Sequence, residues 1–383
     1  MNDFRDQIIE TMMKWRPPYA LTDDEISRVA DALFSTIESF LIGADEATRN
    51  DFRARIIARF KYIDHALYRD VNPDAFPMDE FRAELARRAE PMRDGKSVHL
   101  ELGVSKEWPQ SRADAYVMQE CIGDVIRLDM NPNYELEVVG SVTALPFADE
   151  SIDRIYSNSL FEHVPYPHDI IREAFRVLRP GGYILTVVPF HFVEHVCPGD
   201  FLRYTGQFFE QVGGDAGFVD IYIDTKSCSG VYYTTHQLLK AGIVMDRESH
   251  PICQSAQLMH AYSLLLLAAA QVLDPFFHAH GASCWHTTYA LMSKPGSYAP
   301  RTDTIDRSKP IYERFDDLIC PRTGLPLKVE GEEMVSLDNQ FRYPIIDSKP
   351  QLFIMHGFNS SFTKAESSRE KLAAWRAAEG IPA

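Results

Sequence analysis

The sequence predicts an α/β protein built on a doubly wound parallel sheet, with an all-helical N-terminal region and a small C-terminal β module. Between residues 98 and 188, apolar β-type runs alternate with helical or turn-like segments. This alternation is typical of parallel strands joined by crossover helices. Before residue 95, apolar residues recur at helical spacing, which predicts the helices. The predicted strands are Val98–Leu102, Val125–Leu128, Ile152–Tyr156 and Tyr183–Val188.

The length and charge of the chain narrow the classes of protein it can be. A chain of 383 residues is expected to form two or three compact units. The formal net charge of −16, without a run of Lys or Arg, disfavours nucleic acid as a direct partner.

Cysteine usage and hydropathy indicate the compartment. The six cysteines are scattered without a C-x-x-C pair, which favours reduced thiols and a cytoplasmic location. The first ten residues contain acidic side chains and show no signal-peptide pattern. The apolar run Leu258–Phe277 is interrupted by polar residues, so a buried helix is expected there and no transmembrane segment. A helix lying on a membrane surface is the alternative.

Residues 1–95 are expected to form a helical cap or a homodimerisation surface. Residues 22–25 have the spacing of a capping box, and a third helix is expected at Asp79–Arg88. A substrate lid is the alternative reading of this region. Two apolar stripes define the first helices: Ile26, Val29, Ala30, Leu33, Ile37 and Phe40, then Phe52, Ile56, Phe60, Ile63 and Leu67.

Small and polar residues stand where the predicted strands end. Glu101 and Gly103 end the first strand, Asp129 the second, and Asn158 follows the third. In parallel sheets a ligand binds beyond the carboxyl ends of the strands, so this set predicts a nucleoside site. Asp129 can accept hydrogen bonds from both ribose hydroxyls. Alternatively, it only caps the turn Asp129–Pro132.

Three later motifs carry a resemblance to a known family. They are Leu-Pro-Phe at 145–147 before an acidic Ser-x-Asp segment, Leu-Phe-Glu-His-Val at 160–164, and Arg-Val-Leu-Arg-Pro-Gly-Gly at 176–182. In this order they resemble class I S-adenosylmethionine-dependent methyltransferases, over about Lys96 to Phe218. Residues 195–205 are similar to a loop in the bacterial branch that acts on small molecules or glycans, where a helix follows. The resemblance implies a Rossmann-like sheet.

The resemblance also implies the cofactor, S-adenosyl-L-methionine, and the residues that line its site. Glu101 and Gly103 would lie under the methionine part, and Asp129 would hold the ribose. Met130 would pack on the adenine, Leu145 would contribute an apolar wall, and Asn158 would line the sulfonium pocket. Ser141 stands where the family usually has an Asp that binds the adenine amine. The implied set is Glu101, Gly103, Asp129, Met130, Ser141, Leu145 and Asn158.

The turn after the first strand departs from the family pattern. The family has a Gly-x-Gly-x-Gly turn, whereas residues 103–108 read Gly-Val-Ser-Lys-Glu-Trp. The sequence therefore leaves two hypotheses. The first is a methyltransferase that transfers a methyl group to O or N of a small metabolite or glycan precursor. The alternative is a non-catalytic binding or scaffold protein of the same fold.

Two histidines are the candidate catalytic bases, because the ordinary pKa of histidine lies near neutrality. His163 follows the third strand, and His195 lies in the loop similar to that of the family. A role in structure is the alternative for each. His191, His195 and Cys197 also have the spacing of metal ligands, but Pro198 and Gly199 follow at once, so no metal is predicted.

The predicted domain boundaries follow from these patterns. Residues 96–293 are expected to be the methyltransferase-like domain and 294–310 a polar linker. Residues 311–355 resemble the small zinc-ribbon-like activator of tRNA and translation-factor methyltransferases, fused in cis. Only Cys320 remains of its metal ligands. This module is expected to cover an apolar face or recruit a partner. Residues 356–383 are expected to be a charged helical tail.

Overall fold

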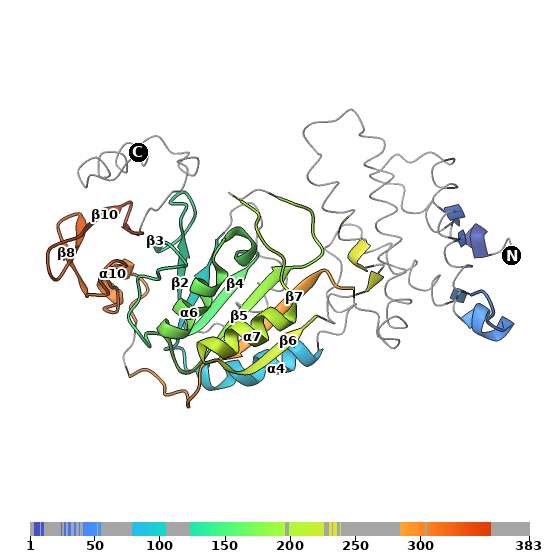
Figure 1. Cartoon of the computed structure of the whole chain (residues 1–383), viewed down its shortest axis with the longest axis horizontal. Coiled ribbons are helices and arrows are strands. Elements are labelled where there is room, and N and C mark those ends of the chain that lie inside the picture. The colour runs from blue at the N-terminus through green and yellow to red at the C-terminus, as the bar shows by residue number, and fades with distance from the viewer. Residues whose placement is uncertain are drawn as a thin grey trace. The chain divides into compact units, whose positions relative to one another are not determined.

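The structure, a computed structural model, divides into two compact units (Figure 1). The first comprises residues 1–79, 189–195 and 225–287, and the second comprises 80–188, 196–224 and 288–383. Scattered positions in 4–54 and 230–238 are described as well. The longer continuous described stretches are residues 41–51, 79–104, 123–195, 199–225, 284–302 and 305–353.

The second unit is organised on one large, mostly parallel sheet. In the described part of the chain it has 11 strands in the order β6-β7-β5-β4-β1-β2-β3-β11-β10-β9-β8. The strands β1 to β5 are parallel neighbours, whereas β6 and β7 pair antiparallel. The first seven strands are β1 (Val98–Leu102), β2 (Asp124–Asp129), β3 (Val138–Gly140), β4 (Ile152–Asn158), β5 (Leu178–Pro189), β6 (Val219–Asp224) and β7 (Thr287–Ser293). The predicted α/β class and parallel sheet are confirmed.

Among the residues that the structure describes, three 11-residue helices accompany this sheet. The helix α6 (Pro167–Val177) begins with a proline, which suits the first turn, and packs beside α7 (Gly206–Ala216) in Figure 1. The helix α4 (Asp79–Ala89) matches the third predicted N-terminal helix. It packs on the antiparallel edge, where the ring of Phe81 lies 4.9 Å from that of Tyr289. Two short 3-10 turns, η2 (Glu90–Met92) and η3 (Phe161–His163), precede β1 and follow β4.

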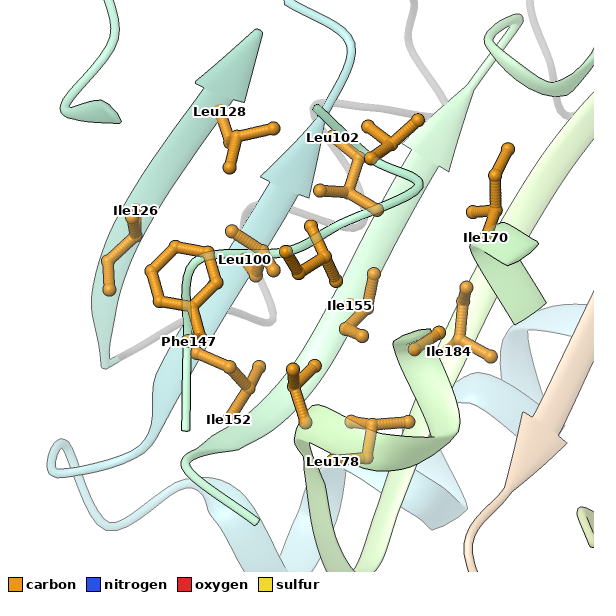
Figure 2. Packing of buried hydrophobic residues seen from close by; sticks show 14 of the residues in the cluster. Leu100, Leu102, Ile126, Leu128, Phe147, Ile152, Ile155, Ile170, Leu178 and Ile184 are labelled. Atoms are coloured by element: carbon orange, nitrogen blue, oxygen red, sulfur yellow. The ribbon is translucent and has the colours of Figure 1, made fainter. Parts of the chain in front are cut away.

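The hydrophobic core lies between the sheet and its helices. Figure 2 shows Leu100 and Leu102 of β1 near Ile126 and Leu128 of β2, with Phe147 packed against this cluster. All five side chains are at most 1% exposed. Because successive strand residues face opposite sides, burial of nearly every residue of β4 and β5 indicates that both faces of the central sheet are covered.

The amino ends of β1 and β4 are held by the buried carboxylate of Asp153. It accepts a hydrogen bond from Val98 N at 2.7 Å and is paired with Arg179 at 2.9 Å and Arg301 at 3.0 Å. Arg301 belongs to the predicted linker 294–310 and also donates to Ser151 O. The described residues of this segment therefore make specific contacts with the amino edge of the sheet.

The C-terminal module extends the same sheet. It contains α10 (Ile311–Arg314), β8 (Leu327–Glu330), β9 (Glu333–Ser336), β10 (Arg342–Ile346) and β11 (Lys349–Leu352). The strand β11 pairs parallel with β3, with Gln351 opposite Val139 and Leu352 opposite Gly140. Inside the module, the Sγ atom of Cys320 lies 3.1 Å from the hydroxyl of Tyr343, and both residues are buried. The module thus joins the sheet through its edge and its core.

Several predicted elements lie outside the described residues, wholly or in large part. These are the helices expected at 22–40 and 52–67, the run Leu258–Phe277 and the tail 356–383. The positions described within 24–38 are helical. Among the residues that the structure describes, no helix combines the length and the apolar character needed to cross a membrane.

Candidate functional site

The candidate site lies at the carboxyl edge of the parallel sheet. The strand order reverses between β1 and β4, because β2 lies on one side of β1 and β4 on the other. Such a reversal opens a crevice beyond the carboxyl ends of the strands. Leu102 is in register with Leu128 of β2 and Ser157 of β4. The sequence-predicted residues that follow these three strands are therefore brought to one edge.

Gly103 occupies a position that only glycine adopts without strain. Its φ is +77°, and its N–H donates to Leu128 O at 3.1 Å. A Cβ atom at this position would lie 3.1 Å from Cβ of Leu160. The turn after β1 is therefore packed closely against the segment that follows β4.

Asp129 is held by the backbone of two turns. Its Oδ2 accepts a hydrogen bond from Val104 N at 3.1 Å, and its Oδ1 accepts one from Asn131 N at 2.8 Å. Burial raises the pKa of this carboxyl to about 6, although these backbone amides favour the charged form. Asp129 caps its turn with three backbone donors, the third being Met130 N, and a carboxylate offers about four acceptor sites. Turn capping and the predicted ribose contact are therefore compatible.

Glu101 is engaged by a neighbour on the next strand. Its carboxylate lies 3.3 Å from the Nε of Arg127, the residue in register with it on β2. Arg127 in turn lies 3.7 Å from the carboxylate of Glu137. Sequence reasoning missed Arg127 and Glu137. The predicted contact of Glu101 with the methionine part of a cofactor stays a prediction.

The loop from residue 141 to 148 is tied to α6. Glu173 accepts from Leu145 N at 2.7 Å, and Arg176 donates to Leu145 O at 2.9 Å. The Leu145 side chain is 1% exposed and belongs to the core. Ser141 is half-buried, and its hydroxyl lies 2.9 Å from that of Thr143. The predicted roles of Ser141 and Leu145 at a cofactor stay predictions.

Asn158 and Met130 complete the predicted set. Both are half-buried and follow directly from strands, Asn158 as the last residue of β4 and Met130 as the first residue after β2. Ser159, next to Asn158, has a φ of +49°, an uncommon conformation for a residue with a side chain. Such backbone conformations cluster at functional sites.

Glu162, in η3, is the least solvated carboxyl group at this edge. It is 0% exposed, and within the described part of the chain neither carboxylate oxygen has a hydrogen-bond partner. Burial raises its pKa to about 8; the charge of Asp200 adds to this effect and that of Arg203 opposes it. A buried polar group without a partner is costly, which favours a functional explanation.

The two candidate histidines lie in different units. In the second unit, Nδ1 of His163 lies 2.6 Å from Gly199 O, and its Nε2 lies 3.8 Å from Glu162 Oε1. In the first unit, Nδ1 of His195 lies 3.1 Å from Val193 O. Of these two histidines, His163 therefore belongs to the second unit, which contains the sheet. The catalytic role of His195 stays a prediction.

Comparisons with known proteins identify part of this unit. Residues 110–186 match the family described as "Methyltransferase domain". This stretch of the chain is therefore similar to a methyltransferase domain. At this level the resemblance to class I S-adenosylmethionine-dependent methyltransferases is confirmed.

Curated relatives of the methyltransferase domain match over part of their length. The malonyl-[acyl-carrier protein] O-methyltransferase 1 of Coxiella burnetii is 36% identical over 113 residues, which is 27% of this chain and 39% of that protein. An uncharacterized methyltransferase of Mycobacterium tuberculosis is 46% identical over 48 residues, 12% of this chain and 19% of that protein. The chain thus spans less than half the length of these relatives.

Solved structures of methyltransferases are also similar to this chain, at low identity. A phosphoethanolamine N-methyltransferase 2 from Haemonchus contortus is 15% identical and covers 61% of this chain and 59% of its own, with a TM-score of 0.34. A geranyl diphosphate C-methyltransferase from Streptomyces coelicolor is 11% identical and covers 56% and 80%, with a TM-score of 0.32.

Sequence reasoning did not single out Glu162 as a candidate site residue. From the Leu-Phe-Glu-His-Val motif it selected only His163. A signal was present, because an acidic residue in a short segment that contains Leu160, Phe161 and Val164 near a strand end has no obvious solvated face. The burial of this side chain still depends on residues 199–204, which approach it only in the folded chain.

Proposed function

We propose that this protein is an S-adenosylmethionine-dependent methyltransferase that transfers a methyl group to O or N of a small metabolite or glycan precursor. The match of residues 110–186 to the methyltransferase domain supports the reaction class. The acidic net charge of −16 supports a small acceptor over nucleic acid. The relatives' names include an acyl-carrier O-methyltransferase and a phosphoethanolamine N-methyltransferase, so both acceptor atoms occur among similar proteins.

The observation that carries the proposal is the carboxylate of Asp129. Burial and a raised pKa make this group receptive to further hydrogen bonds, since each donor that it gains favours the ionised form. Three backbone amides donate to this carboxylate, and about four acceptor sites leave it capacity for a further donor. Together with the left-handed glycine turn at Gly103, this carboxylate supports binding of the ribose of a nucleoside cofactor.

The proposed roles of the other residues follow the edge of the sheet. S-adenosylmethionine, when bound, supplies a methyl group carried on a positively charged sulfur. Gly103 lets the backbone approach the methionine part, Met130 packs on the adenine, and Asn158 lines the pocket of the sulfur. Glu101, Ser141 and Leu145 are proposed to support this site from its rim. His163 takes a proton from the acceptor.

Calorimetric titration with S-adenosylmethionine and S-adenosylhomocysteine tests the proposal. We expect saturable binding by the native chain and loss of binding in the Asp129→Ala variant. The Asp129→Asn variant keeps the side-chain volume and controls for loss of the turn, with circular dichroism reporting its fold. If the native chain binds neither compound at millimolar concentration, the non-catalytic binding or scaffold protein is the better description.

A further inference from the structure

Glu162 lies beside the proposed cofactor site and no role in the proposed mechanism uses it. Leu160, two residues before it, packs against the turn at Gly103. On the other side, Phe201 N donates to Glu162 O at 2.8 Å. The hydroxyl of Tyr204 donates to Phe161 O at 2.7 Å. The backbone of this segment is thus held between the turn after β1 and residues 201–204.

The charged groups around Glu162 do not neutralise it. Arg203 is the nearest cation among those that affect its pKa, but its guanidinium already donates two hydrogen bonds to Asp200, one of them at 2.7 Å. The Asp200 carboxylate repels a charge on Glu162. Tyr204 is neutral, and burial and the charge of Glu162 raise its pKa further. Among the described residues of this unit, His163 is a further titratable neighbour of Glu162.

The backbone determines which nitrogen of His163 can accept a proton. A carbonyl oxygen accepts hydrogen bonds and cannot donate them, so Nδ1 of His163 carries a proton that it donates to Gly199 O at 2.6 Å. Nε2 is then the basic nitrogen. It lies 3.8 Å from Glu162 Oε1. The His163 side chain is 10% exposed and that of Glu162 is 0% exposed, so the histidine is the accessible member of the pair.

We propose that Glu162 is a positioning residue that acts through His163: its carboxylate stabilises the imidazolium that forms when His163 takes the proton of the methyl acceptor. This inference rests on the proposed function and deepens it. The O–H or N–H bond of the acceptor breaks, and its proton goes to Nε2 of His163. The electron pair stays on the acceptor atom, which bonds the methyl carbon, while the carbon–sulfur bond breaks and leaves its pair on sulfur.

The pair formed by Glu162 and His163 also restricts the chemical class of the methyl acceptor. An acceptor with a hydroxyl or an amine supplies the proton that the pair can hold, and the product imidazolium is balanced by the Glu162 carboxylate. An acceptor that is already a carboxylate has no proton to give and is repelled by the ionised forms of Glu162 and Asp200. The structure therefore favours hydroxyl or amine acceptors.

Infrared spectroscopy of the full chain tests the coupling without any acceptor. We expect the native protein to show a protonated carboxyl band that disappears with a midpoint near pH 8 and is missing from Glu162→Gln. In His163→Gln the midpoint should rise by about one pH unit or more, because the ionised carboxylate loses its partner. The Glu90→Gln variant, at an exposed carboxyl before β1, should leave the titration unchanged. A midpoint that does not respond to His163→Gln overturns the proposal.

Transfer of a labelled methyl group from S-adenosylmethionine to ethanolamine, tyramine and malonate tests the acceptor class. We expect turnover of an amine or phenol that rises with pH to a plateau above about pH 8. Glu162→Gln should lower kcat at least about tenfold and abolish this pH dependence, with unchanged affinity for S-adenosylhomocysteine. Preferred turnover of malonate, insensitive to Glu162→Gln, contradicts the proposal. If the native chain does not bind S-adenosylhomocysteine, the proposed function is contradicted instead. The infrared titration still tests the coupling between Glu162 and His163.

Discussion

Asp129 shows how one carboxylate serves both the fold and the site. Its folded pKa of about 6 lies above the ordinary value of 3.8 because burial disfavours the charge. Between these two pH values the native state holds the proton more tightly than the unfolded chain. Its contribution to the free energy of unfolding therefore decreases as the pH rises through this window. Hydrogen bonds from a bound ribose would offset that loss by favouring the ionised form.

The affinity for S-adenosylhomocysteine should therefore depend on pH through Asp129. Below about pH 6 the protonated carboxyl loses acceptor capacity, and we expect Kd to rise roughly tenfold per pH unit in that range. Calorimetry between about pH 5 and about pH 8 measures this slope. In Asp129→Asn the affinity should be weaker and flat across the same range. A native Kd that does not change with pH would exclude this carboxyl as the ribose acceptor.

Gly103 should not tolerate a side chain. We expect Gly103→Ala to lower the free energy of unfolding by about 1–2 kcal/mol, because its φ of +77° is left-handed. The added Cβ would also press on Leu160, which can disturb the turn under the proposed cofactor. Denaturant titration measures the first effect and cofactor binding the second. Gly324→Ala has a comparable φ of +70° with open space around it, so it reports the backbone strain alone.

At the scale of the elements, the amino edge of the sheet depends on Asp153. This fully buried carboxylate joins β1, β5 and the segment containing Arg301. We expect Asp153→Asn to lower the free energy of unfolding by roughly 3–5 kcal/mol, because two arginines lose the charge that they pair with. Chemical denaturation measures this change. Asp149→Asn, whose side chain is 74% exposed, should have little effect. Equal effects of the two variants would contradict the assigned network.

At the scale of the whole molecule, the C-terminal module is part of the second unit and shares its core. Leu352 on β11 is 0% exposed and lies opposite Gly140 of β3. We expect Leu352→Ala to lower the stability of the second unit by about 2–5 kcal/mol. Leu337→Ala, at a side chain that is 54% exposed in the same module, should change stability by less than about 0.5 kcal/mol.

Thermal unfolding followed by two probes distinguishes a shared core from an attached module. If β11 and the rest of the second unit unfold together, Leu352→Ala should lower the midpoint temperature of the same unfolding transition that shifts when the cofactor binds. A module that folds by itself would melt separately and leave that transition unchanged. The predicted boundary between the methyltransferase-like domain and the module, at residues 294–310, stays a prediction, as does homodimerisation through the N-terminal helices.

The sequence by itself determined the elements of the sheet. Strands were predicted at 98–102, 125–128, 152–156 and 183–188, and the observed strand ends lie within two residues of the predicted ones. The exception is the amino end of β5, which begins at Leu178. Local patterns suffice for these elements because buried parallel strands are apolar on both faces and glycine or proline interrupts them. The same patterns brought Gly103, Asp129 and Asn158 to the ends of their strands.

Only the tertiary structure decided which polar groups meet. The pairing of Glu101 with Arg127, the burial of Leu145 and the isolation of Glu162 all depend on neighbours distant along the chain. The joining of β11 to β3 likewise brings together residues about two hundred positions apart. Hydropathy and spacing report which side chains leave water, but they carry no information about which partner each will find. Desolvation and charge pairing depend on that partner, and so the chemistry of the site is determined only in the folded chain.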